Sequence, residues 1–587
     1  MDSSVSPIIN DQNPRNTLSS SSPKPSKGGW NSAIFVIFVE MAQRFAYYGV
    51  AGNLITYLTN DLHQPIATAA KNVNTWIGVS ALFPILGALL ADSFLGRFKT
   101  ILLSSVIYLL GMVLLILSVS VVPANHRQGV FFLALYILAV GEGGHKPCVQ
   151  TFAADQFDER KPEEKAAKSS FFNWWYLGIV VGATTAVLVA VSVQDNVGWT
   201  AGFGMLAGAL VVALIIFLIG VKRYRIEAPV GSPYTGVGQV FVAAVRKRRV
   251  SETREGWGIC YGDEKDGADL EGQPKVRSLA RTNQFRFLDK AMIMDNIDSS
   301  SQTRNPWRLC TLNQVEQVKQ LLRLIPIWLT CLMFNATIVQ SHTFFIKQGT
   351  TMLRSIGPHF LLPPASLQCL IGFTILVFVP LYDRLFVPLA RKITGHPSGI
   401  TMLQRIGTGL FLSTLEMVVA ALVEAKRVKI AADYGLIDTP KSTVPMSLGW
   451  LVPQFMIGGL ADVFTVVGLQ ELFYDQMPES MRSMGAAAYI SIVGIGSFLS
   501  TAVILVVQAV TSRLGRGGGE WLGDNLNRAH LDYFYWVLAV LSVLNLGVYV
   551  WVSNCFVYKK VEESEQEMEM ETETETERER KEMSTGS

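Results

Sequence analysis

Acidic and basic side chains stand at helical spacing inside an apolar stretch near the start of the chain. Glu40 and Arg44 are four residues apart, so they share one face of a helix. Tyr47 and Tyr48 extend that face with hydrogen-bonding groups. A charge at the centre of a membrane span costs at least about 2.5–3.5 kcal/mol, and such residues are functional candidates by default. We interpret this face as the lining of a water-filled cavity. A self-neutralising pair that only lets the helix insert is the alternative.

Further polar residues lie deep in later apolar stretches. Lys146 ends a glycine-rich run in the first half of the chain, and Asp462 is an isolated acid in the second half. A bridge between them would form when one side of a central cavity closes and break when it opens, which predicts a gate. Two separately solvated charges are the alternative. Gln340 adds a candidate substrate contact, and for His342, which lies nearer the outer end, we favour a structural or rim role.

Apolar stretches long enough to cross a bilayer carry these residues. Only 17% of the 587 residues are charged, against roughly 25% in soluble chains. A hydrocarbon core of ~30 Å needs roughly 20 apolar residues at 1.5 Å each. Twelve stretches meet this length, which predicts an all-α membrane protein. They are 30–58, 73–95, 100–122, 129–152, 170–193, 198–220, 316–346, 364–388, 400–424, 446–473, 482–510 and 530–556.

The basic residues predict how these helices are oriented. Lys and Arg in short loops mark the cytoplasmic side. Here they follow the even-numbered stretches, so both termini are expected to be cytoplasmic. This rule does not separate the plasma membrane from the vacuolar membrane. The residues are Arg97, Lys99, Arg160, Lys161, Lys165, Lys168, Lys222, Arg223, Arg225, Arg384, Arg391, Lys392, Arg482, Lys559 and Lys560.

The long polar segment between stretches six and seven divides the chain into two six-helix halves. The basic run 246–249 within it is interpreted as part of a solvated linker, with a basic helix on anionic lipid as the alternative. Cytoplasmic regulators of the linker or tail are an open expectation. The predicted parts are a disordered N-terminus at 1–29, a bundle at 30–220, the linker at 221–315, a bundle at 316–556 and an acidic tail at 557–587.

The chemistry of enzymes and metal sites has no signature in this sequence. None of the six cysteines forms a C-x-x-C pair, and at least three lie in apolar runs. We find no P-loop, nucleophile elbow or dinucleotide fingerprint. The sequence therefore predicts neither an enzyme nor a metal or cofactor site, and it indicates no nucleic-acid partner. The expected partners are a small-molecule substrate and the lipid bilayer.

Several motifs resemble known transporter families. Gly87 to Arg97, with Asp92 at its centre, resembles the G-x-L-x-D-x-x-G-R signature of the major facilitator superfamily, in which Asp and Arg lock helices together at a tight cytoplasmic loop. FVEMAQRFAYYG (38–49), KPC (146–148) with FAADQFD (152–158), and FYDQMPESMRS (473–483) resemble the proton-coupled oligopeptide transporter family, closest to its plant nitrate-and-peptide branch.

The resemblance implies the major facilitator fold and secondary transport of nitrate, a di- or tripeptide or a related plant metabolite by alternating access. Glu40 and Arg44 match the family's E-x-x-E-R motif, Lys146 matches its helix 4 lysine, and Asp462 falls where it has a glutamate. Gln43 replaces the second acid, so proton coupling is open. The alternatives are an uncoupled facilitator or exporter, and a non-transporting sensor on the same fold.

Overall fold

The computed structural model describes residues 28–157, 162–226, 233–249, 281–294, 305–356, 360–394, 400–440, 442–477, 482–514 and 521–558. The predicted N-terminus and acidic tail thus lie almost wholly outside the described residues. The first half contains α1 (Trp30–Ala51), α2 (Leu54–Asn60), α3 (Ile66–Leu90), α4 (Arg97–Ser120), α5 (Ala124–Ala154), α6 (Pro162–Thr185), α7 (Val191–Asn196) and α8 (Trp199–Ile219).

The second half is built in the same way. Its helices are α11 (Leu312–Ile338), α12 (Phe344–Thr350), α13 (Cys369–Leu381), α14 (Val387–Thr394), α15 (Met402–Asp433), α16 (Val452–Gln476), α17 (Arg482–Leu514) and α18 (Leu531–Asn554). Short strands occur only as two pairs among the described residues. These pairs are β1 (Met352–Leu353) parallel to β4 (Val444–Ser447), and β2 (Ser355–Ile356) antiparallel to β3 (Phe360–Leu361).

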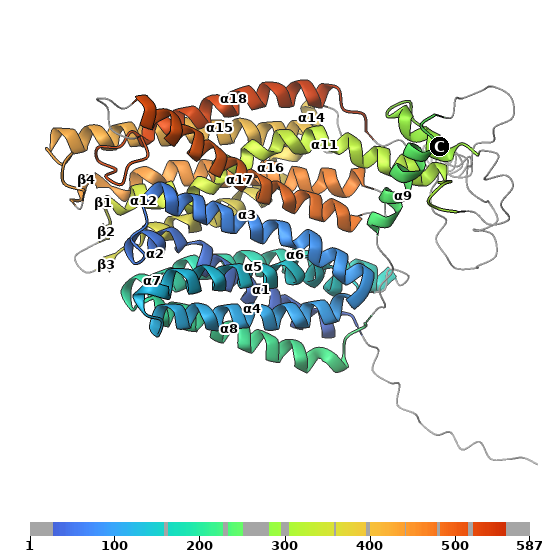
Figure 1. The fold of residues 1–587 in the computed structure, drawn as a ribbon, viewed down its shortest axis with the longest axis horizontal. Coiled ribbons are helices and arrows are strands. Elements are labelled where there is room, and N and C mark those ends of the chain that lie inside the picture. The colour runs from blue at the N-terminus through green and yellow to red at the C-terminus, as the bar shows by residue number, and fades with distance from the viewer. Residues whose placement is uncertain are drawn as a thin grey trace, which may run out of the picture.

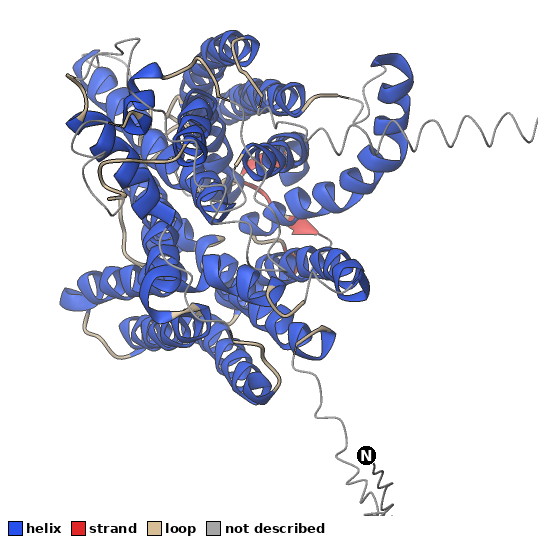
Figure 2. Ribbon diagram, turned by 90° about the vertical axis from the view of Figure 1, so that its right-hand side faces the viewer, coloured by secondary structure: helices blue, strands red, loops and turns tan. Residues whose placement is uncertain are grey.

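The long helices run side by side in two groups, one from each half of the chain (Figure 1). The connection between the halves, with α9 (Pro233–Arg246), lies at one end, which we call the linker end. The strands, α2 and α12 lie at the other, which we call the distal end (Figure 1). Figure 2 shows that strands are a minor component beside the helices. The predicted all-α fold is confirmed.

Eleven of the described helical segments are long and apolar enough to cross a membrane. The remaining long helix, α5, has 31 residues and extends about 46 Å at 1.5 Å per residue. It packs along α3 and α4. Its composition is less apolar because it carries Glu142, His145 and Lys146 in mid-helix. With α5, the spanning helices match the twelve predicted stretches.

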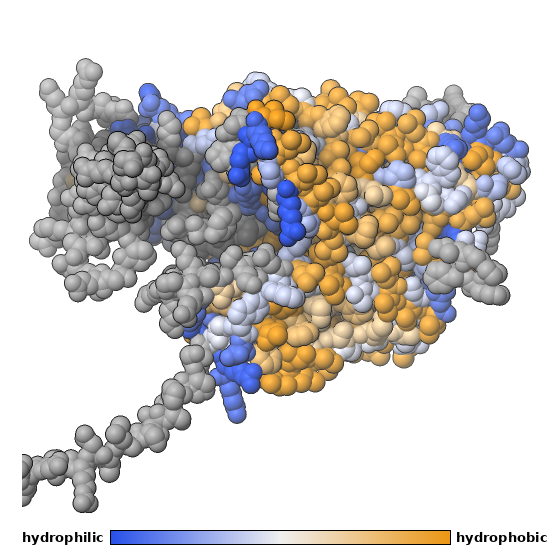
Figure 3. Space-filling view, turned by 180° about the vertical axis from the view of Figure 1, so that it is seen from behind, coloured by the Kyte–Doolittle hydropathy of each residue, from blue (hydrophilic) through white to orange (hydrophobic). Residues whose placement is uncertain are grey.

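The outer surface of the bundle is apolar in the middle and hydrophilic toward the ends (Figure 3). Large apolar side chains point outward there: Leu110 is 60% exposed, Val212 56% and Leu544 63%. Soluble monomers rarely expose contiguous apolar patches above a few hundred Å². This surface is suited to lipid, and the prediction of an integral multi-pass membrane protein is confirmed.

The two halves are joined at the distal end. Among the described residues, each hydrogen bond that joins α1–α8 to α11–α18 lies between the distal end and the middle of the bundle. We call these contacts the distal seal. They are Ile66 N to Asp524 Oδ1 (2.8 Å), Lys71 Nζ to Gln508 Oε1 (3.0 Å), Asn74 Nδ2 to Ser500 Oγ (3.1 Å), Lys347 Nζ to Thr59 Oγ1 (2.9 Å) and Asn60 Oδ1 (3.4 Å), Ser366 Oγ to Val187 O (3.5 Å), and Gln368 Nε2 to Gly52 O (2.9 Å).

The described parts of the linker are packed against the second half and are not wholly solvated. An apolar core joins α9, the 3₁₀ helix η5 (Arg286–Met292) and the start of α11. Lys247, in the predicted basic run, is 1% exposed, and its Nζ donates to the carbonyl of Ile293 at 2.5 Å. This part of the basic run is therefore a structural contact, because a buried ammonium needs a fixed partner.

Replacing Lys319 tests this packing. Its ammonium is fully buried on α11 and lies 2.5 Å from Asp289 Oδ1 and 2.8 Å from Glu316 Oε1. Lys319→Met leaves two buried carboxylates without that cation, which costs about 3–5 kcal/mol. We expect faster protease cleavage within 281–294 in the purified protein. Lys222→Met, at an exposed lysine of the same end, is the control; equal cleavage of both variants would contradict the prediction.

Candidate functional site

A pair of opposite charges lies on the inner face of α1. The Arg44 Nε atom is 2.7 Å from Glu40 Oε1, one helical turn away. The Glu40 side chain is 2% exposed and the Arg44 side chain 13%. Helix α6 presses against this turn, since a Cβ on Gly182 would lie 2.4 Å from the Met41 carbonyl oxygen. The shared face predicted for Glu40 and Arg44 is thus present, in direct contact.

A second pair of charges faces α1 from α5. Lys146 Nζ lies 3.7 Å from Glu142 Oε1. The Lys146 side chain is 19% exposed, and that of Glu142 is 1% exposed. The amide of Gln43 on α1 donates to Glu142 Oε2, so the two helices are joined by a buried hydrogen bond. We call Glu40, Arg44, Glu142 and Lys146 the charge cluster.

Aromatic side chains form one wall of the charge cluster. Lys146 Nζ lies 5.5 Å from the centre of the Tyr47 ring, within the range of a cation–π interaction. The Tyr47 ring is stacked on the Trp76 ring, with 5.5 Å between the ring centres. The Tyr48 ring packs edge-on against the Tyr47 ring, with 5.3 Å between the centres. The Trp76 indole donates to the carbonyl of Leu135 at 2.9 Å. Tyr47 and Tyr48, both predicted site residues, therefore do lie at the cluster.

Glycines on α3 and α5 allow the close approach that sets the position of Glu142. A Cβ on Gly87 would lie 2.1 Å from the carbonyl oxygen of Gly143, and a Cβ on Gly144 would lie 2.0 Å from Ser104 Oγ. Small residues let backbones in membranes approach this closely. The glycine-rich run before Lys146 is thus a packing surface. It directs the opposite face of α5, with Glu142 and Lys146, toward α1.

Asp462 is on α16 of the other half and is half-buried. It is near enough to interact electrostatically with Tyr48, Tyr176 and Tyr489. The ion-pair partner of Lys146 in this conformation is Glu142, not Asp462. The bridge predicted between Lys146 and Asp462 is therefore not formed in this conformation, and the gate that it would make stays a prediction.

Gln340 is not brought to the charge cluster. It is fully buried in the 3₁₀ turn η6 (Val339–His342), and its amide donates to Ala336 O at 2.8 Å and to Ser500 Oγ at 3.1 Å. Ser500 also accepts from Asn74 of the first half. Gln340 therefore belongs to the network behind the distal seal, and its role as a substrate contact stays a prediction. His342 is half-buried at the end of the same turn.

The predicted lock residues meet at the linker end. Arg97 Nε lies 3.6 Å from Asp92 Oδ1, and its guanidinium also contacts Asp155. Asp92 is in the π-helical turn η1 (Ala91–Leu95), Arg97 begins α4, and Asp155 follows α5. Arg97 therefore ties three helix ends together. Asp155 was not predicted as a site residue. It lies inside the FAADQFD motif, and that motif could have indicated it.

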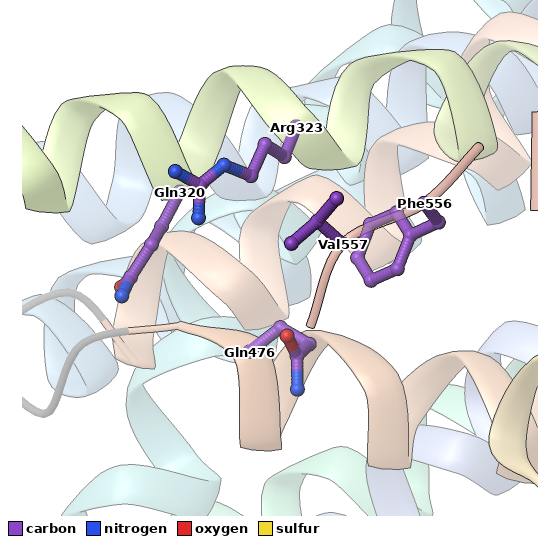
Figure 4. A pocket seen from close by; sticks show the side chains of 5 residues that line it. All are labelled: Gln320, Arg323, Gln476, Phe556 and Val557. Carbon is purple, nitrogen blue, oxygen red and sulfur yellow. The ribbon is translucent and has the colours of Figure 1, made fainter. Parts of the chain in front are cut away.

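A small pocket elsewhere at the linker end is unrelated to the charge cluster. It is lined by Gln320 and Arg323 of α11, Gln476 of α16, and Phe556 and Val557 after α18 (Figure 4). None of the site residues predicted from the sequence lines it. Within the described residues, no group of three or more His, Cys, Asp or Glu side chains could hold a metal ion.

Two helical halves, sealed at one end and holding buried charges on helices inside the bundle, form the architecture of a secondary transporter. The chain belongs to the POT family, whose model, PTR2, matches residues 98–521. It is 60% identical over 544 residues to Protein NRT1/ PTR FAMILY 5.4 of Arabidopsis thaliana, covering 92% of this chain and 97% of that one. Protein NRT1/ PTR FAMILY 5.10 of the same plant is 49% identical over 556 residues, covering 92% and 95%.

Solved structures agree on the fold. An auto-inhibited POT family peptide transporter superposes with a TM-score of 0.68 at 20% identity, covering 89% of this chain and 96% of that one. The POT family transporter PepTSo superposes with a TM-score of 0.67 at 20% identity, and the match covers 89% of this chain and 98% of that one. The predicted major facilitator fold and the predicted transporter family are both confirmed. The protein is a secondary transporter.

Proposed function

We propose that the substrate is a small polar solute with an anionic group, and that Arg44 and Lys146 bind this group. The proposal rests on the difference in exposure between the cations and the carboxylates of the charge cluster. The side chains of the two cations are 13% and 19% exposed, whereas those of the two carboxylates are 2% and 1% exposed. A solute entering the bundle would therefore meet positive charge first. The Tyr47 and Tyr48 rings would shape the same surface.

Similar proteins support nitrate and small peptides as the first substrates to try. The relatives carry the name NRT1/ PTR. One POT structure is in complex with sulfate and another with 5-aminolevulinic acid. Each of these ligands has an anionic group. Nitrate and the carboxylate end of a dipeptide offer the same chemistry to an arginine and a lysine.

Alternating access would open the distal seal and close the linker end. We propose that this structure is the state closed at the distal end, because the inter-half hydrogen bonds of the described residues gather there. The linker end would face the cytoplasm of the plasma or vacuolar membrane, as the loop charges predict. In the opposite state Asp462 would replace Glu142 as the partner of Lys146.

Uptake and current in oocytes expressing the full chain test the function. We expect nitrate, a dipeptide such as dialanine, or both to enter above the level of water-injected cells. Measurement at acid and neutral external pH shows whether protons are carried as well. A protein that reaches the cell surface yet moves neither solute nor any of a wider panel of small anions would contradict the proposal.

Cross-linking the distal seal tests alternating access. Lys71→Cys with Gln508→Cys joins the halves where Nζ and Oε1 are 3.0 Å apart. In a background without native cysteines, we expect a short bifunctional thiol reagent to stop uptake and a reducing agent to restore it. Arg405→Cys with Glu471→Cys, a 3.5 Å contact within the second half, is the control and should stay active. Full uptake by the cross-linked distal pair would refute the mechanism.

A further inference from the structure

Glu142 is the least exposed member of the charge cluster, and its two carboxylate oxygens differ. Oε2 accepts the hydrogen bond from the Gln43 amide. Oε1 has no hydrogen-bond partner among the described residues. The Lys146 ammonium is 3.7 Å from Oε1, beyond the usual 2.7–3.2 Å of such a bond. One buried oxygen of Glu142 is therefore available to a proton.

Charged and titratable groups face this carboxylate from three helices. Lys146 is on the same helix, α5. Helix α1 contributes Glu40, Arg44, Tyr47 and Tyr48, and helix α4 contributes Tyr108. With both carboxylates ionised and both cations charged, the charge cluster is neutral. Burial favours the neutral acid and the two cations favour the anion, so a movement of Lys146 changes which form is stable.

Glu40 is less suited to exchange a proton than Glu142. Its Oε2 also lacks a hydrogen-bond partner among the described residues, but its Oε1 is held by Arg44 Nε at 2.7 Å, a charge-assisted hydrogen bond, and arginine keeps its proton in proteins. The partner of Glu142 is a lysine, whose flexible chain lets the ammonium leave for another anion. Asp462 has no cation of the charge cluster as its ion-pair partner here.

We propose that Glu142 is the residue that takes up and releases the transported proton, with Gln43 positioning its carboxylate. This rests on the proposed function. A proton from water adds to Oε1, Glu142 becomes neutral, and the charge of the cluster rises from zero to plus one. Lys146 keeps its own proton and loses its anionic partner, so it can bind the anionic group of the substrate. Departure of the substrate returns Lys146 to Glu142, which releases the proton.

Infrared spectroscopy tests the proposal without a substrate. The full-length protein in nanodiscs is titrated while the carbonyl stretch of protonated carboxylic acids is recorded. All protonated carboxyl groups absorb in this region. We expect one component of the band that grows as the pH falls to be missing from Glu142→Gln and to remain in Glu40→Gln and Asp462→Asn. Gln43→Leu removes the positioning hydrogen bond and should shift the frequency and midpoint of the band. An unchanged band in a folded Glu142→Gln protein would overturn the proposal, as would loss of the band only in Glu40→Gln or Asp462→Asn.

Transport provides the second measurement. Nitrate and dialanine uptake into oocytes is compared at several external pH values for wild type and Glu142→Gln, each normalised to protein at the surface. We expect the wild-type rate to depend on pH and the Glu142→Gln rate to lose that dependence, whereas Glu142→Asp keeps it. The same pH profile in both proteins would overturn the proposal. If wild type moves neither solute, the proposed function fails. The infrared measurement still shows in that case whether Glu142 takes up a proton.

Discussion

We expect Lys146→Met to abolish uptake and to destabilise the protein, and Lys146→Met combined with Glu142→Gln to restore stability without restoring uptake. The single change leaves the Glu142 carboxylate, 1% exposed, without its cation. Removing one partner of a buried pair costs about 3–5 kcal/mol. The double variant replaces both charges with neutral groups of similar size, which is often close to neutral for stability. Uptake stays lost because the cation that would bind the anionic group is gone.

Two measurements separate these effects. Thermal unfolding of the purified protein reports stability, and oocyte uptake normalised to surface protein reports transport. Lys99→Met removes an exposed lysine at the linker end and should match wild type in both. Wild-type uptake by the double variant would show that Lys146 serves only to neutralise Glu142. Equal stability of all variants would show that the pair does not support the fold.

We expect Gly87→Ala to separate α3 from α5 and to lower both stability and uptake. The new Cβ would lie 2.1 Å from the carbonyl oxygen of Gly143, 2.6 Å from its carbonyl carbon and 2.8 Å from the Cα of Gly144. These are backbone atoms, so no side chain can turn aside and the helices must part. Overpacking costs about 1–3 kcal/mol. Glu142 and Lys146 lie beside this contact on α5, so their distances to α1 change as well.

A matched glycine provides the control for this prediction. Gly208 on α8 has nothing within 4 Å of an added Cβ. Alanine there should leave the melting temperature unchanged or slightly raised, since it is the better helix former. Melting curves in detergent and uptake per molecule at the surface measure both variants. A Gly87→Ala protein as stable and active as Gly208→Ala would show that the approach of α3 and α5 is not needed.

Gln43 shows where sequence reasoning about the site stopped. Gln43 has an amide where the family motif has its second acid. The sequence therefore predicted that the site would have one carboxylate fewer than the family motif supplies. The structure supplies that carboxylate from α5, as Glu142 in contact with Gln43. The i,i+4 spacing of Glu142 and Lys146 was visible in the sequence and could have indicated the pair. That this pair faces α1 was not visible.

Features carried by one helix were determined by the sequence alone. The twelve apolar stretches follow from the composition along the chain. The shared face of Glu40 and Arg44 follows from local spacing, because a helix places residues i and i+4 together wherever it lies. The contact of Asp92 with Arg97 was indicated by a short motif. The family followed from motifs of the same local kind. These predictions needed no knowledge of which helices touch.

Contacts between helices were decided only by the tertiary structure. Gln43 meets Glu142 across 99 positions of sequence, Gln340 turns to Ser500, and Lys146 pairs with Glu142 rather than with Asp462. Each depends on how far a helix is rotated about its axis and how near its neighbour lies. Glycine backbones such as those of Gly87 and Gly143 set that distance. Hydropathy cannot report it, since an apolar segment has the same composition whichever face it turns inward.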